Sequence, residues 1–336
     1  MPSLAVAEAL GERGVTVSFA GSPERAEARL VPEAGYELDT FPISGLPRRP
    51  SVMLVRTLAR AVRAPVACTR ILARRRPHVV FGGGGYVAGP MVVAAAARRL
   101  PAALSEADAH LGLANRLATP FARRVFLSFP IDGREGPKYR VTGRPIPARS
   151  RARPRDEGRR LFRLPAASAV LLVFGGSLGA RPLNELAVEA FGATGPSVLH
   201  LCGERDYELL RDRVRRDDYR LLPFTDEFGA ALGAADLALS RAGGSVWELA
   251  AAGLPAVLVP GPWATADHQT KNAHYFERGG GAVVVPESDL RAVPDVVRAL
   301  FADARRLGEM REAMLRVARP DAAETVAEEL VALARG

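Results

Sequence analysis

The chain has 336 residues, 48% of them hydrophobic, a length that suits two domains with a core each. Its net charge is +9, and its two cysteines, Cys68 and Cys202, have no metal-binding spacing, so a structural zinc or a disulfide framework is not expected and a reducing compartment fits. Neither a membrane span nor a signal peptide is predicted, because apolar stretches are short and Glu8 and Glu12 interrupt the first one.

Helical and strand patterns alternate along the chain, which predicts an α/β fold with parallel sheets. In the first half we expect helices at 3–12, 23–33, 51–64, 66–75 and 88–99, and strands at 15–19, 36–41, 78–81 and 101–104. Residues 143–165 are rich in proline and arginine and predict a linker and the entry to a second domain. Beyond it we expect strands at 169–176, 197–201, 219–223, 236–240, 255–259 and 281–285, and closing helices at 290–302, 304–317 and 322–335.

Two glycine-rich segments each connect a predicted strand to a helix. In GGGGYVAGP, residues 82–90, four consecutive glycines exceed what a tight turn needs, which favours close approach of a ligand to the backbone. In FGGSLGA, residues 174–180, the Ser177 hydroxyl can donate to a phosphate oxygen. The second signal is weak alone, because many Rossmann-like turns look similar, and it is neither a Walker loop nor a full GxGxxG pattern.

The segment 235–273 carries the sharpest signal. A strand ends at Arg241, and Gly243 and Gly244 then open a helix that carries Glu248 in its first turn. A helix end opened by glycine can hold a diphosphate, and a carboxylate one turn deeper can accept two hydrogen bonds from a ribose diol.

The next strand of this segment ends at Pro260, and the loop after it delivers Asp267, His268, Gln269 and Asn272. Amide side chains donate and accept, which suits neutral sugar hydroxyls. Taken by itself, Glu248 would be interpreted as a solvated helix residue, and His268 by itself as a capping or surface histidine. The ordered set predicts a nucleotide-sugar site, because loops at the carboxyl ends of parallel strands lie together.

Six motifs together resemble the MurG family over nearly the whole chain: GGGGYVAGP, GLANR (112–116), TGRP (142–145), GGSLGA, SRAGGSVWE and DHQTKNA. The resemblance implies the GT-B fold, with two Rossmann-like domains whose parallel sheets face a cleft. The implied domains are an acceptor- and membrane-facing domain at 1–143, a UDP-sugar donor domain at 144–318, and a C-terminal helix at 319–336 that packs back on the first domain.

The same resemblance implies an inverting transfer of GlcNAc from UDP-GlcNAc to lipid I, giving lipid II in peptidoglycan synthesis, without a metal or an organic cofactor. The implied diphosphate contacts are Ser177, Gly243, Gly244 and Ser245; Glu248 would bind ribose and the backbone of Thr225 would bind uracil. Gln269 and Asn272 would bind the GlcNAc hydroxyls. Asn115 would also bind the donor, although it faces the cleft from the acceptor side. On that side, the acceptor loop consists of Gly83, Gly84, Gly85 and Tyr86.

The chain departs from the family pattern at three places. It begins at the helix that normally follows a first strand and a GGTGGH-like loop, so the family's candidate general base, a histidine, would lie upstream of Met1; a late start site or a truncation is our explanation. Pro147 stands where an arginine is common, and the spacing before Glu248 is one residue short. The catalytic base is therefore unassigned, with Asp108 and His110 as the nearby candidates.

A basic face is expected at residues 47–76. Between Asp39 and Glu106 there is no acidic residue, and Arg56, Arg60 and Arg63 alternate with apolar side chains. An ordinary core-facing helix has this pattern too, but the lack of acids and the lipid substrate favour an anionic membrane surface, with the protein peripheral on the cytoplasmic face of the plasma membrane. Nucleic acid is disfavoured, since its usual motifs are missing from the sequence.

Other functions remain open. The donor motifs also fit a related GT-B transferase with another acceptor, a UDP-GlcNAc epimerase, or an inactive donor-binding relic.

Overall fold

The structure is a computed structural model that describes residues 2–43, 52–176, 179–262 and 267–336, with the backbone alone for 52–63. It divides into two compact units: unit 1 is Met1–Pro147 with Asp321–Gly336, and unit 2 is Ala148–Pro320. The unit bounds thus lie at 147 and 320, where 143 and 318 were expected. Both units have parallel sheets covered by helices, so the predicted α/β class is confirmed.

Unit 1 holds a four-stranded parallel sheet in the order β3-β4-β5-β6 and a separate parallel pair, β1-β2. Its strands are β1 Phe19–Gly21, β2 Leu38–Thr40, β3 Val80–Gly82, β4 Ala102–Glu106, β5 Arg124–Leu127 and β6 Tyr139–Val141. Its helices are α1 Pro2–Gly11, α2 Glu27–Glu33, α3 Val52–Arg75, α4 Gly85–Ala97, α5 Leu113–Ala118, the 3₁₀ turn η1 Thr119–Phe121, and α14 Ala322–Arg335.

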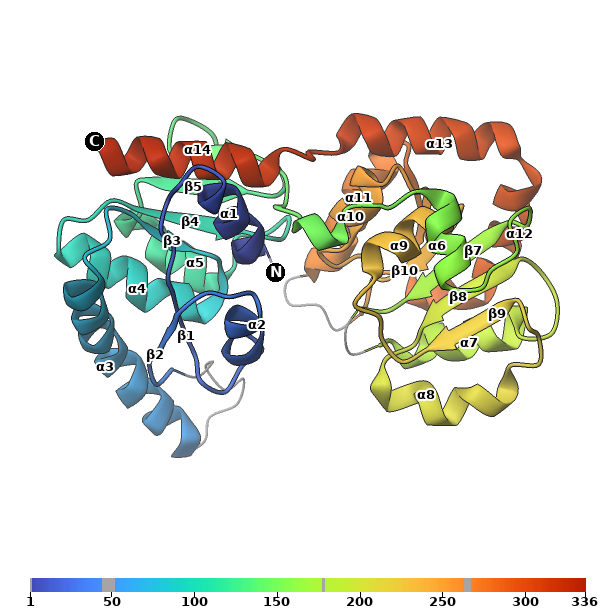
Figure 1. Cartoon of the computed structure of the whole chain (residues 1–336), viewed down its shortest axis with the longest axis horizontal. Helices are drawn as coiled ribbons and strands as arrows, with labels where there is room; N and C mark the ends of the chain where they lie inside the picture. The colour runs from blue at the N-terminus through green and yellow to red at the C-terminus, as the bar shows by residue number, and fades with distance from the viewer. Residues whose placement is uncertain (1, 44–51, 177–178, 263–266) are drawn as a thin grey trace. The chain divides into compact units, whose positions relative to one another are not determined.

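Alternate residues of the central strands of unit 1 serve two cores, because successive side chains of a strand point to opposite faces. Leu104 and Val125 pack with residues of α3 and α4, whereas Ala103 and Phe126 pack with α1 and α14. The C-terminal helix α14 therefore lies beside α1 on the second face (Figure 1). Glu329 of this helix also pairs with Arg124 at 3.0 Å, which ties α14 to β5.

Unit 2 holds a six-stranded parallel sheet in the order β12-β11-β10-β7-β8-β9. Its strands are β7 Val170–Phe174, β8 Ser197–Leu201, β9 Tyr219–Leu222, β10 Leu237–Ser240, β11 Ala256–Leu258 and β12 Ala282–Val284. Its helices are α6 Arg155–Leu161, α7 Arg181–Phe191, α8 Glu204–Leu210, α9 Phe228–Ala234, α10 Val246–Ala251, α11 His268–Arg278, α12 Val293–Ala302 and α13 Ala304–Val317, with 3₁₀ turns η2 Ala148–Ser150, η3 Arg211–Arg213 and η5 Glu287–Ala292. The strand order reverses between β7 and β10, as in a doubly wound Rossmann sheet.

The structure corrects the sequence prediction in the segment expected to be a linker. Residues 155–161 form α6, which packs on α9: an added Cβ at Gly158 would lie 2.3 Å from the Ala230 oxygen. Arg159 is buried there, with Nη2 2.8 Å from an Asp236 carboxylate oxygen. Arg159 of this segment is thus a core residue, which composition alone does not indicate.

Two further predictions about unit 1 were wrong in detail. The two helices expected at 51–64 and 66–75 are the single helix α3, which continues through Pro65. The first strand lies at Phe19–Gly21 rather than at 15–19. Strands β5 and β6 were missed.

Candidate functional site

The ends of β7 and β10 define the centre of the candidate site. The two strands pair in parallel with Phe174 opposite Ser240, so Gly175 and Arg241 leave the sheet side by side at its carboxyl edge. The strand order reverses at this pair, and ligands of open α/β sheets bind at such a reversal. The second glycine loop and the Arg241–Glu248 segment therefore start from the same place.

The turn after β10 leads directly into α10. Gly243, Gly244 and Ser245 are partly exposed, and the Glu248 amide donates to the Ser245 oxygen at 3.0 Å. Glu248 is half-buried in the first turn of α10, as predicted from the sequence. An added Cβ at Gly243 would meet no atom within 4 Å, so backbone packing does not explain this glycine.

The two amide residues of α11 take different positions beside this turn. Asn272 is fully buried, and its Nδ2 donates to the Ala242 oxygen at 3.2 Å. Gln269 is partly exposed, and its Oε1 accepts from the Gly261 amide at 2.8 Å. Both side chains thus connect α11 to the loops after β10 and β11, and Gln269 is the more accessible to a ligand.

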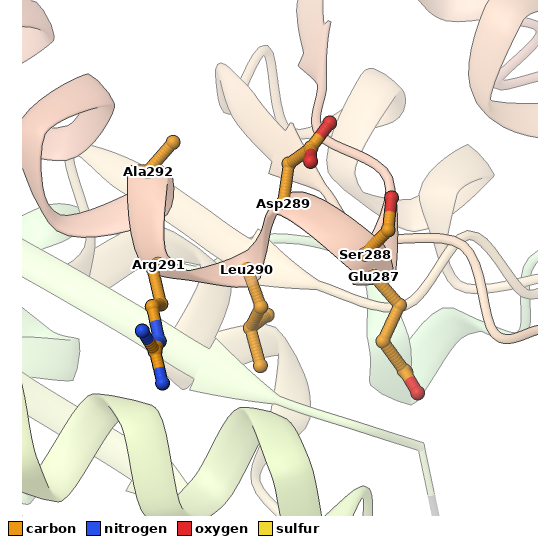
Figure 2. A pocket seen from close by; sticks show the side chains of 6 residues that line it. All are labelled: Glu287, Ser288, Asp289, Leu290, Arg291 and Ala292. Carbon is orange, nitrogen blue, oxygen red and sulfur yellow. The ribbon is translucent and has the colours of Figure 1, made fainter.

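Arg241 has a role that the sequence analysis missed. Its Nη1 donates to the Val259 and Pro260 oxygens, at 3.2 Å each, and its guanidinium forms an ion pair with Glu287. Glu287 is the first residue of the turn η5, and this turn lines an open pocket with a volume of about 560 Å³ (Figure 2). An arginine directly after a strand was the available signal, but its partner 46 residues later could not be found from spacing.

The second glycine loop contains Ser177, which lies outside the described residues. Gly179 has a φ of +70°, and an added Cβ would lie 2.1 Å from the Cys202 oxygen. Glycine is therefore required here by conformation and by the close approach of β8's end. The first residue of α7, Arg181, then pairs with buried Asp206 at 3.0 Å.

A chain of buried polar side chains lies beneath this loop. Asn184 Nδ2 donates to the Cys202 oxygen at 2.7 Å and to Asp206 at 3.0 Å, so its Oδ1 is the acceptor for His200 Nε2 at 3.1 Å. His200 Nδ1 then accepts from the Tyr219 hydroxyl at 2.8 Å. Burial lowers the pKa of His200 to about 3, which keeps the imidazole neutral. The hydrogen bonds of Arg205 and Arg181 lower the pKa of Asp206 to about 2 against its burial.

Thr225 borders a cavity of about 350 Å³ at the β9 edge of unit 2. The lining includes Leu161, Phe162, Arg163, Arg220, Leu222 and Glu227. Arg220 Nη2 donates to the Arg163 oxygen at 3.2 Å, which closes one wall. Only Thr225 of this set was singled out from the sequence, and the wall formed by Leu161, Phe162 and Arg163 comes from a distant segment.

The first glycine loop lies in unit 1, between β3 and α4. Gly84 has a φ of +98°, and an added Cβ would lie 3.1 Å from the Ser105 oxygen, so the turn itself requires glycine there. Its neighbours Gly83 and Gly85 flank this turn. Tyr86 packs on the core, and the guanidinium carbon of Arg25 lies 5.6 Å from the centre of the Tyr86 ring. Gly84 is thus explained by the turn without a ligand, contrary to the expectation that the glycines exceed what a turn needs, and the acceptor role of the loop stays a prediction.

Asn115 is buried at the start of α5 and organises the loop before it. Its Nδ2 donates to the Ser105 oxygen at 3.0 Å and to Glu106 at 2.8 Å. The buried Glu106 carboxylate also accepts from the amides of Ala107 and Gly112, at 2.9 Å each. The Asn115 Oδ1 is buried and accepts no hydrogen bond from the described residues.

The proposed membrane face falls largely outside the description. Arg56, Arg60 and Arg63 lie in α3, but their side chains are not among those described. Within the described ranges, none of the helices combines the length and the apolar character needed to cross a bilayer. On α5 and η1, large apolar side chains are exposed at Leu113, Leu117 and Phe121, next to exposed arginines at 116 and 123.

Comparison with known proteins identifies the family. Residues 1–127 match the glycosyltransferase family 28 N-terminal domain and residues 170–326 match the glycosyltransferase family 28 C-terminal domain. The UDP-N-acetylglucosamine–N-acetylmuramyl-(pentapeptide) pyrophosphoryl-undecaprenol N-acetylglucosamine transferase of Acidithiobacillus ferrooxidans is 42% identical, over all of this chain and 94% of the relative. The Halothermothrix orenii enzyme of the same name is 34% identical, over all of this chain and 96% of the relative. The chain belongs to the MurG family.

Solved structures agree with this assignment of the MurG family. The crystal structure of Acinetobacter baumannii MurG superposes with a TM-score of 0.74 at 27% identity, covering 98% of this chain and 95% of that one. A UDP-GlcNAc 2-epimerase from Neisseria meningitidis shares the fold alone, with a TM-score of 0.68 at 13% identity, covering 98% of this chain and 95% of that one. The predicted GT-B fold is confirmed, and this MurG-family chain is a glycosyltransferase.

Proposed function

We propose that the chain transfers GlcNAc from UDP-GlcNAc to undecaprenyl-pyrophosphoryl-muramyl-pentapeptide, lipid I, and so forms lipid II for peptidoglycan synthesis. The observation that carries the proposal is the ordered Arg241–Asn272 set at the carboxyl ends of β10 and β11, beside the strand reversal of unit 2. The relatives' shared name supplies the acceptor. The product class connects the enzyme to cell-wall biogenesis, cell shape and cell division.

In this proposal, unit 2 holds the donor. The backbone around Gly243, Gly244 and Ser245, with Ser177, receives the diphosphate, and Glu248 accepts the ribose hydroxyls. The Thr225 backbone binds uracil, a role that the neighbouring cavity supports. Gln269 is the more accessible of the two residues assigned to the GlcNAc hydroxyls, since Asn272 is fully buried.

The acceptor is assigned to unit 1. The loop Gly83–Tyr86 faces it. Asn115, in the same unit, is assigned to a hydroxyl of the UDP-GlcNAc donor, because its buried Oδ1 accepts no hydrogen bond from the described residues and such an acceptor is costly. An acceptor hydroxyl attacks the anomeric carbon, the bond to the UDP oxygen breaks with inversion, and the proton passes to a base. Asp108 and His110, close to Asn115 in the chain, are the candidates for that base.

The leaving diphosphate is stabilised in this scheme by backbone N–H groups at helix starts, and the scheme includes no metal or organic cofactor. UDP-GlcNAc is a substrate. Nucleic acid has no part in the proposal.

The enzyme is further proposed to be peripheral on the cytoplasmic face of the plasma membrane. The exposed Leu113, Leu117 and Phe121 beside arginines support this, because apolar side chains rimmed by cations suit an anionic bilayer surface. The arginines at 56, 60 and 63 of α3 extend the same basic character.

The test is a transfer assay with UDP-[¹⁴C]GlcNAc and lipid I in detergent, with products separated by chromatography and identified by mass. The proposal expects labelled lipid II and one UDP released per transfer. Label on another acceptor, UDP-N-acetylmannosamine formed without acceptor, or donor binding without turnover would each replace the proposal by one of its alternatives.

A further inference from the structure

Arg241 connects the ends of three neighbouring strands. The residue follows β10, its Nη1 donates to the Val259 and Pro260 oxygens after β11, and its guanidinium pairs with Glu287 after β12. The side chains of Arg241 and Glu287 are 12% and 23% exposed, so the pair is shielded from most of the solvent. Such a pair is screened less by salt than a surface pair.

The loops held by Arg241 are those assigned to the donor. On one side, Ala242 accepts from Asn272 at 3.2 Å, and the glycines that open α10 follow directly. On the other side, Pro260 is followed by Gly261, whose amide donates to Gln269 at 2.8 Å. The guanidinium therefore fixes the spacing between the diphosphate turn and the loop that orients Gln269.

Glu287 is the charged partner that fixes this guanidinium. Two carbonyl oxygens accept from one nitrogen of Arg241, Nη1, whereas the carboxylate pairs with Nη2 and so determines the orientation of the planar group. In the turn η5 the side chains of Glu287 and Asp289 point to opposite sides (Figure 2), and Asp289 is exposed. Asp289 is thus a matched acidic residue on the same turn without this role.

We propose that Glu287 is a positioning residue of the donor site, acting through Arg241 on the loops after β10 and β11. Glu287 touches no substrate in this account, and the inference rests on the proposed donor function. Its chemical consequence is specific: Glu287 strengthens the binding of a nucleoside-diphosphate sugar although it adds a negative charge near the diphosphate.

Charge alone would have the opposite effect. If Glu287 only neutralised Arg241, Glu287→Gln would leave an uncompensated cation near the diphosphate turn and tighten donor binding. If Glu287 positions Arg241, the same variant weakens donor binding. The sign of the change therefore separates the two explanations.

The experiment uses the full chain and compares Glu287→Gln, Asp289→Asn, Arg241→Met and the Glu287→Gln/Arg241→Met double variant. We expect Glu287→Gln to raise the Kd and the KM for UDP-GlcNAc about tenfold with little change in kcat, and Asp289→Asn to match the wild type. We expect the double variant to bind no worse than Arg241→Met, because the two residues act as one unit. Unchanged or tighter binding by Glu287→Gln, or additive effects in the double variant, would overturn the proposal.

A second measurement does not depend on any ligand. Hydrogen exchange of the Gly261 amide reports the loop that Arg241 holds, and Glu287→Gln should speed it several-fold while Asp289→Asn leaves it unchanged. If the wild type fails to bind UDP-GlcNAc, the proposed function fails, and exchange at Gly261 still decides the positioning role. Unchanged exchange in Glu287→Gln would overturn that role.

A fallback is available if Glu287→Gln unfolds. The double variant Glu287→Leu/Arg241→Met replaces both charges by apolar groups, and we expect it to fold and to show the same fast exchange of the Gly261 amide. Exchange at the wild-type rate in this double variant would overturn the proposal.

Discussion

The Nε2 atom of His200 lies 3.1 Å from Oδ1 of Asn184, and both side chains are fully buried. Because the Asn184 amide nitrogen is committed to Cys202 and Asp206, this contact assigns the proton of the neutral imidazole to Nε2. A directional chain of hydrogen bonds then runs from Tyr219 through His200 and Asn184 to Asp206, next to the start of α7. The second glycine loop is therefore anchored by a neutral histidine.

The first prediction concerns acid stability. Burial lowers the pKa of His200 from 6.5 to about 3, so between these values the unfolded chain binds a proton that the native state does not. The free energy of unfolding should thus fall as pH decreases through this window, by up to about 1.4 kcal/mol per pH unit, and His200 should add no pH dependence above it. Denaturant unfolding of His200→Gln between pH 6 and 4 should show a slope smaller by about that amount. The same substitution at exposed His78 should keep the wild-type slope, and an equal effect of both variants would contradict the assignment.

The second prediction separates two glycines of unit 2. Gly179→Ala should lower the free energy of unfolding by at least about 1–3 kcal/mol, because its φ is +70° and the new Cβ would meet the Cys202 oxygen at 2.1 Å. Gly243→Ala should leave stability unchanged, because its Cβ enters open space. That variant should instead weaken UDP binding, measured by calorimetry, if the diphosphate approaches this turn. A UDP affinity equal to that of the wild type in Gly243→Ala would contradict the proposal that the diphosphate binds at this turn.

The third prediction concerns Glu248 in the first turn of α10. A hydrogen bond to a charged group contributes about 1.5–3 kcal/mol, so Glu248→Ala should raise the KM for UDP-GlcNAc about 10- to 100-fold. Steady-state kinetics would measure the effect, with Glu309→Ala, at an exposed position of α13, as the control. An unchanged KM would exclude Glu248 from ribose binding.

The fourth prediction concerns the membrane. Replacing Leu113, Leu117 and Phe121 together by serine should weaken sedimentation with anionic vesicles, because these exposed apolar side chains would no longer enter the bilayer surface. Changing Arg56, Arg60 and Arg63 to glutamate should do the same, more strongly at low salt. Both variants should bind UDP as the wild type does. Leu209→Ser, at an exposed position of unit 2, is the control, and vesicle binding equal to wild type in both triple variants would remove the membrane assignment.

The sequence predicted the second half of the fold closely because most of its strands are short apolar segments, several of them next to glycine or proline. The expected strand at 236–240 and the observed β10 at Leu237–Ser240 differ by one residue. Helix α6 was missed because its buried Arg159 has no hydrophobic signature, and its packing depends on Gly158 fitting against α9.

The candidate site was predictable where it is local in sequence. Glu248 follows its glycine turn directly, so spacing alone placed it in the first helical turn. The ion pair between Arg241 and Glu287, and the contact between His200 and Asn184, join residues from separate strands and helices. Such contacts follow from the order and register of the sheet, which a single sequence does not encode as a visible pattern.

The most direct test of the central claim, a donor site at the strand reversal of unit 2, is a crystal structure of the full chain with UDP-GlcNAc. The account predicts the ribose hydroxyls within hydrogen-bond distance of the Glu248 carboxylate, with the diphosphate against the Gly243–Ser245 turn. A nucleotide bound away from the carboxyl ends of β7 and β10 would contradict it.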